Sequence, residues 1–195
     1  MIVSLELQPG AMIGEAELME RLQCGRTPLR EALQRVAQQH LVTSVPRKGV
    51  AIAEMDLSGY AQLIEAVSYV EAVTAKLAAQ RADSDHLKRL EGIVESATLA
   101  ARAQDILGVA DLDYEFHLVV AECGANRYIV DTTARLHRLT SRFFYLAMRK
   151  GLTGWVSLHE HRQIITAIAA RDEEAAAVAT QGHTIRGRDR IMSAL

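Results

Sequence analysis

The chain has 195 residues, of which 49% are hydrophobic and 5% aromatic, so it can bury a core, and its many alanines favour packed helices over sheets. No run reaches the roughly 18 apolar residues of a membrane span, and the first residues do not resemble a signal peptide. Cys24 and Cys123 form no CxxC pattern, which argues against a secreted disulfide scaffold and predicts reduced thiols in a cytoplasmic protein.

The net charge is only −2, but the basic residues are unevenly distributed. Residues 21–48 contain six Lys or Arg side chains and a single acidic one, Glu31. A local basic patch on an otherwise acidic chain indicates a surface that binds a polyanion.

Two short helices followed by a hairpin are predicted in the first quarter of the chain. Residues 14–23 suit a short helix, and a second helix is predicted over 26–37, with Pro28 in its first turn. The β-prone runs LVTSV and VAIA, separated by Pro-Arg-Lys-Gly, then predict a hairpin. This order is the outline of a winged helix-turn-helix.

One face of the second helix and the hairpin tip present side chains that suit DNA. Arginine can bond to guanine in the major groove, and Thr or Gln can reach base edges or phosphates. An ordinary amphipathic helix with a solvated charged face is the alternative. The predicted DNA-binding residues are Arg26, Thr27, Arg30, Gln34, Arg47, Lys48 and Gly49.

The run CGRTPLREALQRV, followed by HLV and PRKG, closely resembles the recognition helix and wing of the GntR family of bacterial repressors. Gln8-Pro9-Gly10 is similar to that family's entry to its second helix. The resemblance implies that Arg26, Thr27, Arg30 and Gly49 lie at the DNA. Gly25 departs from the pattern, because the family usually has Ser or Thr there.

The start of the chain is a second departure. The family's first helix precedes the position of Pro9 by ten or more residues, whereas only MIVSLEL stands there. We therefore expect a winged helix-turn-helix that lacks part of its first helix, and DNA binding weaker than that of a longer chain.

The remaining sequence predicts six helices without repeats. The last proline is Pro46, and the change in composition suggests a DNA-binding domain over 1–55 and an all-helical domain over 56–195. The expected fold is mainly α. The predicted helices cover about 57–82, 84–104, 106–123, 127–149, 155–170 and 173–193.

Four residues of the helical part suit a divalent transition metal. Asp113 and His117 are four residues apart, so one helix face presents both. His161 and His183 lie on the two last predicted helices. Three imidazoles and a carboxylate suit zinc, nickel or manganese, with zinc favoured, whereas magnesium and calcium prefer more oxygen ligands. A surface Asp–His hydrogen bond is the alternative.

The pattern DYEFH, then Gly124-Ala-Asn126, Glu160-His161 and His183, resembles the FCD ligand-binding domain, many members of which hold a metal with one Asp and three His. The resemblance implies a homodimeric regulator of a double-stranded DNA operator, controlled by a small organic acid that coordinates the metal. Val67 replaces an arginine often found in the family.

Weaker indications concern the effector and rival functions. Arg138 and Arg142, four residues apart, are candidates for binding a carboxylate, with an exposed face as the alternative. His137 is a weaker candidate for the cavity. A metal-dependent hydrolase or lyase is the rival class, but Glu115 is expected to point away from the ion, and there is no HExxH motif. A metal-binding sensor that has lost DNA binding is a third possibility.

Overall fold

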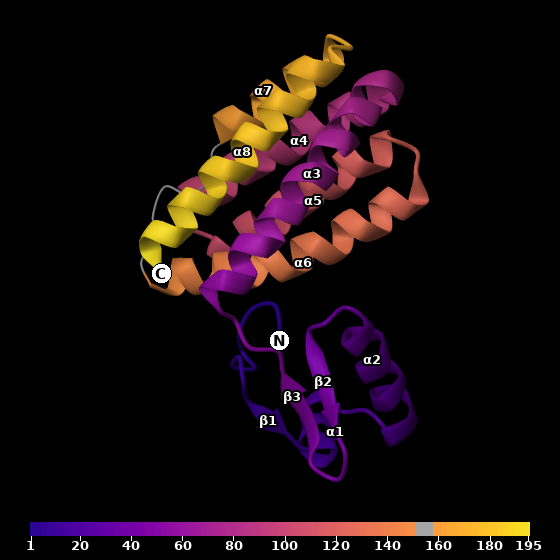
Figure 1. Ribbon diagram of the computed structural model, residues 1–195, viewed down its shortest axis with the longest axis vertical. Coiled ribbons are helices and arrows are strands. Elements are labelled where there is room, and N and C mark those ends of the chain that lie inside the picture. The colour runs from indigo at the N-terminus through magenta and orange to yellow at the C-terminus, as the bar shows by residue number, and fades with distance from the viewer. Residues whose placement is uncertain (151–157) are drawn as a thin grey trace. The chain divides into compact units, whose positions relative to one another are not determined.

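The computed structural model describes residues 1–150 and 158–195, which form two compact units, Met1–Asp56 and Leu57–Leu195. The mainly helical fold predicted from the sequence is confirmed (Figure 1). The predicted break at Gly151–Gly154 and the predicted helix start at 155 lie outside the described residues.

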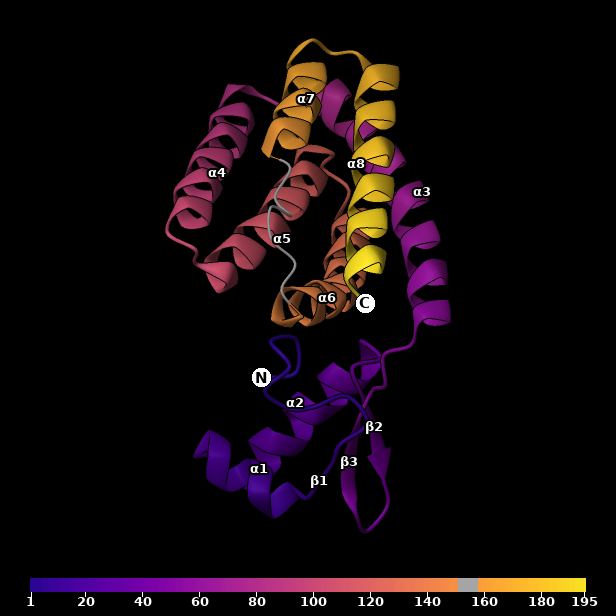
Figure 2. The ribbon, with the colours of Figure 1, turned by 90° about the vertical axis from the view of Figure 1, so that its left-hand side faces the viewer.

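The N-terminal unit is a winged helix-turn-helix. Helices α1 (Glu15–Leu22) and α2 (Arg26–Gln38) are followed by the wing strands β2 (Val42–Val45) and β3 (Gly49–Ile52). The wing strands pair antiparallel, from Val42 opposite Ile52 to Val45 opposite Gly49. The predicted pair of helices and the predicted hairpin are therefore present. Figure 2 shows β2 and β3 side by side, joined by a turn at the tip of the wing.

Helix α2 is held to the unit by its apolar face. Gly25 caps its N-terminus without a side-chain hydrogen bond, as expected for glycine at that position. Leu29 is fully buried, and Leu33 and Val36 pack partly buried against the same core as Leu18. The opposite, polar face of α2 is consequently left open to solvent.

A third strand, β1 (Met12–Ile13), was not predicted. It pairs antiparallel with β3, with Ile13 opposite Val50. Two residues are too short a run to give an alternating pattern, so the strand has no signal in the sequence. Before it, residues 1–7 form turns rather than a helix, and Leu7 packs into the core of the unit.

Gly49 is required by the packing of the wing against β1. Its φ is +112°, and a Cβ there would overlap the carbonyl oxygen of Ile13 and lie 2.9 Å from the Cα of Gly14. We expect Gly49→Ala to destabilise this unit by about 1–3 kcal/mol from backbone conformation alone, with the overlap adding to it. Hydrogen exchange of the β1 and β3 amides measures the loss.

Gly92→Ala is the matched control for this substitution. Gly92 lies inside α4 (Ser84–Arg102), and a Cβ there would meet nothing within 4 Å. Alanine at this helical position should stabilise the chain by about 0.5–1 kcal/mol. Unchanged protection of β1 and β3 in Gly49→Ala would contradict the structural role assigned to Gly49.

In the second unit, the residues that the structure describes form a bundle of six helices, whose bounds agree with the predicted ranges to within a few residues. Its core is formed mainly by alanines and branched aliphatic side chains around the buried Phe116. Among the helices that the structure describes, none combines the length and the apolar composition needed to cross a bilayer. The helices are α3 (Leu57–Arg81), α4 (Ser84–Arg102), α5 (Ile106–Cys123), α6 (Arg127–Arg149), α7 (Leu158–Ala169) and α8 (Glu173–Ala194).

Candidate functional site

The structure brings most of the predicted DNA-binding residues into one groove between α2 and the wing. Arg26 is outside the lining of this groove but is well exposed at the start of α2. The wing tip is sharply turned, and Arg47 has a positive φ of 64°. The predicted residues that line the groove are Thr27, Arg30, Gln34, Arg47, Lys48 and Gly49.

Two of the exposed arginines face an acidic side chain of α1. The Nε of Arg30 donates to both carboxylate oxygens of Glu15 at 3.1 Å. The Nε of Arg26 lies 4.0 Å from the same carboxylate. A surface ion pair of this kind contributes at most about 1 kcal/mol, so it orients Arg30 without preventing it from reaching another anion.

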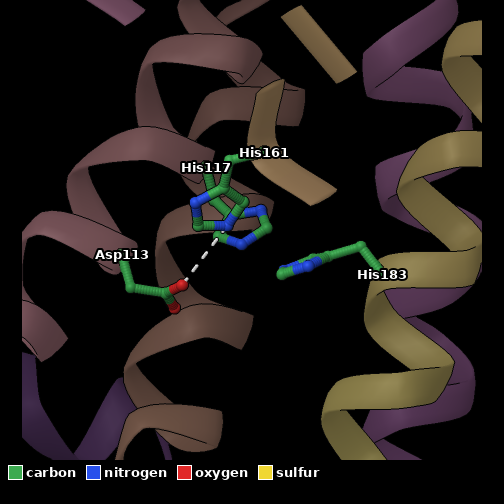
Figure 3. A group of neighbouring side chains, drawn as sticks. All are labelled: Asp113, His117, His161 and His183. Carbon is green, nitrogen blue, oxygen red and sulfur yellow. Dashed lines mark ion pairs between the residues drawn. The ribbon is translucent and has the colours of Figure 1, made fainter. Parts of the chain in front are cut away.

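The four predicted metal ligands meet in the helical unit, although they come from three helices. Asp113 and His117 lie one turn apart on α5, His161 lies on α7 and His183 on α8. One potential ligand atom from each residue lies within 4.8 Å of the other three. In Figure 3 the Asp113 carboxylate and the three imidazole rings are directed into the same space between the helices, and a dashed line joins Asp113 to His161.

Two atoms of this cluster are buried without a hydrogen-bond partner among the described residues. They are Oδ1 of Asp113 and Nε2 of His161, which lie 3.4 Å apart. A buried polar atom without a partner costs roughly 1–3 kcal/mol. The ring of His161 is also fixed in place, because it stacks on Phe116 with ring centroids 4.1 Å apart.

Glu71 of α3 supports His117 from the side away from the cluster. Its Oε1 contacts Nδ1 of His117 and lies 2.8 Å from Nε2 of His137, and the hydroxyl of Thr184 donates to its Oε2. All four side chains are buried. Burial by itself raises the pKa of Glu71, but His117 and His137 outweigh it and hold that pKa well below its usual range.

Glu160 of α7 supports His183 in the same way. Its carboxylate lies 2.9 Å from Nδ1 of His183 and also accepts hydrogen bonds from Arg186 and Arg190. Burial alone would raise the pKa of Glu160, but the hydrogen bonds from these three partners outweigh burial and lower it. The carboxylate therefore stays ionised. Because Nδ1 of His117 and of His183 is engaged by a carboxylate, Nε2 of each ring remains available to bind an ion.

The protonation of His161 also suits ligation. Burial, together with the neighbouring His183 and His117, holds its pKa well below the usual value, so its ring is neutral near pH 7. A neutral imidazole binds a cation without first losing a proton. The cluster therefore presents imidazole nitrogens and one carboxylate oxygen, a donor set that suits a first-row transition metal.

A cavity adjoins the cluster, and its lining differs from the effector residues suggested by the sequence. Asp113, His117 and His183 line it, and so does His137. Neither Arg138 nor Arg142 does: the Arg138 guanidinium lies 5.6 Å from the ring centroid of Tyr114. Arg142 is buried rather than exposed, and burial lowers its pKa.

The supporting roles of Glu71 and Glu160 were not predicted from the sequence. Glu71 had a usable signal, because it is the single carboxylate on the buried face of α3 that also carries Ile64 and Val67. Glu160 entered only as part of the FCD-like pattern, and its contact with His183 on another helix has no local signal. His137, the weaker candidate for the cavity, does line it. Glu115 points away from the cluster as predicted, toward Arg89 at 3.3 Å.

Known proteins with similar sequences are bacterial transcriptional regulators. The Nta operon transcriptional regulator of Aminobacter aminovorans is 26% identical, over 98% of this chain and 90% of its own length. The transcriptional repressor GlaR of Escherichia coli strain K12 is also 26% identical, over 94% of this chain and 87% of its own length.

Solved structures agree with this fold. E. coli McbR/YncC superposes with a TM-score of 0.88 at 16% identity, covering 98% of this chain and 92% of that chain. A GntR protein of Streptococcus agalactiae has a TM-score of 0.57 at 26% identity, covering 96% of this chain and 94% of that one.

The family signatures divide the chain into the same two parts that carry the groove and the cluster. Residues 1–52 match the bacterial regulatory proteins of the gntR family, and residues 62–186 match the FCD domain. The second match covers more than half of the chain. The protein is therefore a DNA-binding transcriptional regulator of the GntR family, in the branch whose second domain is an FCD domain.

Proposed function

We propose that this regulator binds its operator through α2 and the wing, and that a small carboxylate bound at a metal site in the helical unit controls this binding. One observation carries the metal part of the proposal. Oδ1 of Asp113 and Nε2 of His161 are buried 3.4 Å apart, with no hydrogen-bond partner among the described residues. A cation bound between them would satisfy both atoms.

The surrounding carboxylates support this assignment. Glu71 and Glu160 engage Nδ1 of His117 and His183, which leaves Nε2 of each ring for an ion. Metal-ligating histidines commonly have their other ring nitrogen fixed by a carboxylate in this way. Glu71, His117 and His137 form a second group of potential ligands, but its carboxylate is already engaged by both rings, so we assign it an orienting role.

The residues that would hold the ion are Asp113, His117, His161 and His183, and their donor set favours zinc over nickel or manganese. A bound divalent ion supplies positive charge and open coordination positions at which a carboxylate can bind. The cavity beside the cluster supports the idea that a small organic acid is the effector. Arg138 and Arg142 remain predicted contacts, although neither lines that cavity.

For the DNA-binding unit, we propose that the predicted residues contact a double-stranded operator. The groove lined by Arg30, Gln34 and Lys48 supports this, because it joins the recognition helix to the wing. We further infer a cytoplasmic homodimer, since helix-turn-helix regulators commonly read two half-sites with paired recognition helices. We also infer that the chain is not an enzyme: Glu115, the carboxylate between Asp113 and His117, is paired with Arg89 and unavailable as a general base.

The proposal is tested by DNA binding with and without metal and acid. An operator is first selected from random DNA with the zinc-loaded full chain, and affinity is then measured by fluorescence anisotropy. We expect a series of small carboxylates to contain members that change this affinity by about 5- to 150-fold, the usual range of allosteric coupling.

Two controls separate the parts of the proposal. A chelator and the variant His183→Ala should each abolish the response to the acid. If the response persists in both, the acid does not act through the metal site. If no DNA is selected at all, the chain is a sensor that has lost DNA binding.

A further inference from the structure

The cavity beside the proposed metal ligands extends away from them along the helical unit. Its lining residues belong to α3, α5, α6 and α8. On α3 its lining runs from Glu71, next to the ligands, to Tyr60, and a helical rise of about 1.5 Å per residue separates these positions by roughly 16 Å. The cavity is therefore elongated, with the proposed metal site at one end.

The lining residues of α6 and α8 also extend along the helix axes. The lining residues of α6 run from His137 to Phe144, about 10 Å along the axis, and those of α8 from His183 to Ile191, about 12 Å. Figures 1 and 2 show α3 and α8 side by side and antiparallel. Consequently, the C-terminal part of α8 lies at the Tyr60 end of the cavity.

Between its ends the cavity is lined partly by apolar side chains. Ile64 and Val67 of α3 and Ala110 of α5 offer contacts to hydrocarbon and no hydrogen bonds. Thr140 and Ser141 of α6 also line this part, but the hydroxyl of each already donates to the carbonyl oxygen of His137. A ligand that fills the cavity therefore finds its free hydrogen-bond donors at the ends.

Tyr60 lies at the far end of this lining. Tyr60 is only 1% exposed, and its hydroxyl has no hydrogen-bond partner among the described residues. Its ring is fixed against Phe143, with ring centroids 4.4 Å apart. Burial raises the pKa of Tyr60, so the hydroxyl keeps its proton and can donate it to an acceptor.

The other polar side chain at this end is already engaged. Arg188 lines the cavity, but its guanidinium donates to Asp189 at 2.9 and 2.8 Å. Of the described residues that line this end, Tyr60 thus has a donor without an acceptor. A buried hydroxyl left in this state costs roughly 1–3 kcal/mol, which a ligand oxygen would recover.

We propose that the effector is a linear molecule with two polar ends: a carboxylate at the proposed metal site and an acceptor oxygen that receives the hydrogen bond of Tyr60. This inference rests on the proposed function of the metal site. It assigns the chemical class of the effector as a straight-chain dicarboxylate or ω-hydroxy acid, rather than a simple fatty acid. Tyr60 lies in the first turn of α3, just after the end of the N-terminal unit in the sequence.

The test uses isothermal titration calorimetry on the zinc-loaded full chain. The probes are hexanoate and octanoate, their ω-hydroxy derivatives, and the dicarboxylates adipate, suberate and azelate. We expect at least one two-ended acid to bind roughly tenfold or more tightly than the monocarboxylate of the same length, as one hydrogen bond from a buried donor predicts. Tyr60→Phe should abolish this preference and leave the binding of the monocarboxylates unchanged.

Tyr145→Phe is the matched control, because Tyr145 is a buried tyrosine that does not line the cavity, and it should keep the preference. If the monocarboxylates bind in a zinc-dependent manner but no two-ended acid is preferred at any length, the inference is overturned and the proposed metal site stands. The same conclusion follows if the preference survives in Tyr60→Phe. If no acid of the series binds, both proposals fail.

Discussion

Replacing His161 by alanine is expected to remove the metal from the helical unit and to abolish the stabilisation that the metal provides. The cluster supplies four potential ligands, and the substitution deletes the one whose Nε2 is buried without a hydrogen-bond partner among the described residues. An ion that binds only the native state adds about 2.7 kcal/mol at a concentration 100 times its Kd. For a unit of this size that corresponds to a Tm increase of roughly 10 °C.

The measurement compares zinc content and Tm of each variant with and without zinc. Using the zinc-dependent shift removes any effect of the substitution on the apo protein. His183→Ala should behave like His161→Ala. His159→Ala is the matched control, because His159 lies on the same helix but is exposed, and it should keep stoichiometric zinc. Retention of zinc and of the Tm shift by His161→Ala would show that the four residues do not form the site.

Replacing Arg30 by alanine is expected to weaken operator binding by about 1–3 kcal/mol and to relax the preference for one base pair. Arg30 lines the groove between α2 and the wing, where its guanidinium can reach a base edge. Lys48→Ala, at the wing tip, should instead weaken binding to all sequences to a similar degree, because a phosphate contact carries no base information.

Fluorescence anisotropy at fixed ionic strength, with the selected operator and single-base variants of it, measures both effects. Arg35→Ala is the matched control, since Arg35 lies on the same helix but is outside the groove lining. Equal affinity of Arg30→Ala and the unchanged chain for the operator would mean that α2 is wrongly assigned as the recognition helix.

Sequence reasoning predicted the long helices well because each carries a sustained apolar pattern and ends at a recognisable break. The i, i+4 spacing placed Asp113 and His117 on one helix face, and the structure brings His161 and His183 to them. The supporting contacts that the sequence did not predict join segments far apart in the chain. The contacts of Glu71 with His137 and Thr184 join positions 66 and 113 residues apart, and no local pattern reports such a distance.

The predicted effector-binding residues were also affected by contacts that the sequence does not reveal. Arg138 and Arg142 were selected because they are a positively charged pair on one helix, but burial and neighbouring rings decide where each guanidinium lies. Tyr60 was not selected, since a tyrosine near the start of an amphipathic helix usually serves the core. Its significance emerges only when it is found to line the cavity with a hydroxyl that has no hydrogen-bond partner among the described residues.

The contact between Glu15 and Arg30 bears on how DNA binding should respond to electrolyte. A cationic side chain that enters a DNA groove neutralises nearby phosphate charge and usually releases a condensed counterion, and this release makes affinity fall as the salt concentration rises. Here Arg30 must break its ion pair with Glu15 before it binds the DNA. The freed carboxylate of Glu15 then attracts a cation from solution while the DNA releases one. The contribution of Arg30 to the salt dependence should therefore largely cancel. The slope of log affinity against log salt would then count fewer ionic contacts than the number of basic side chains at the interface.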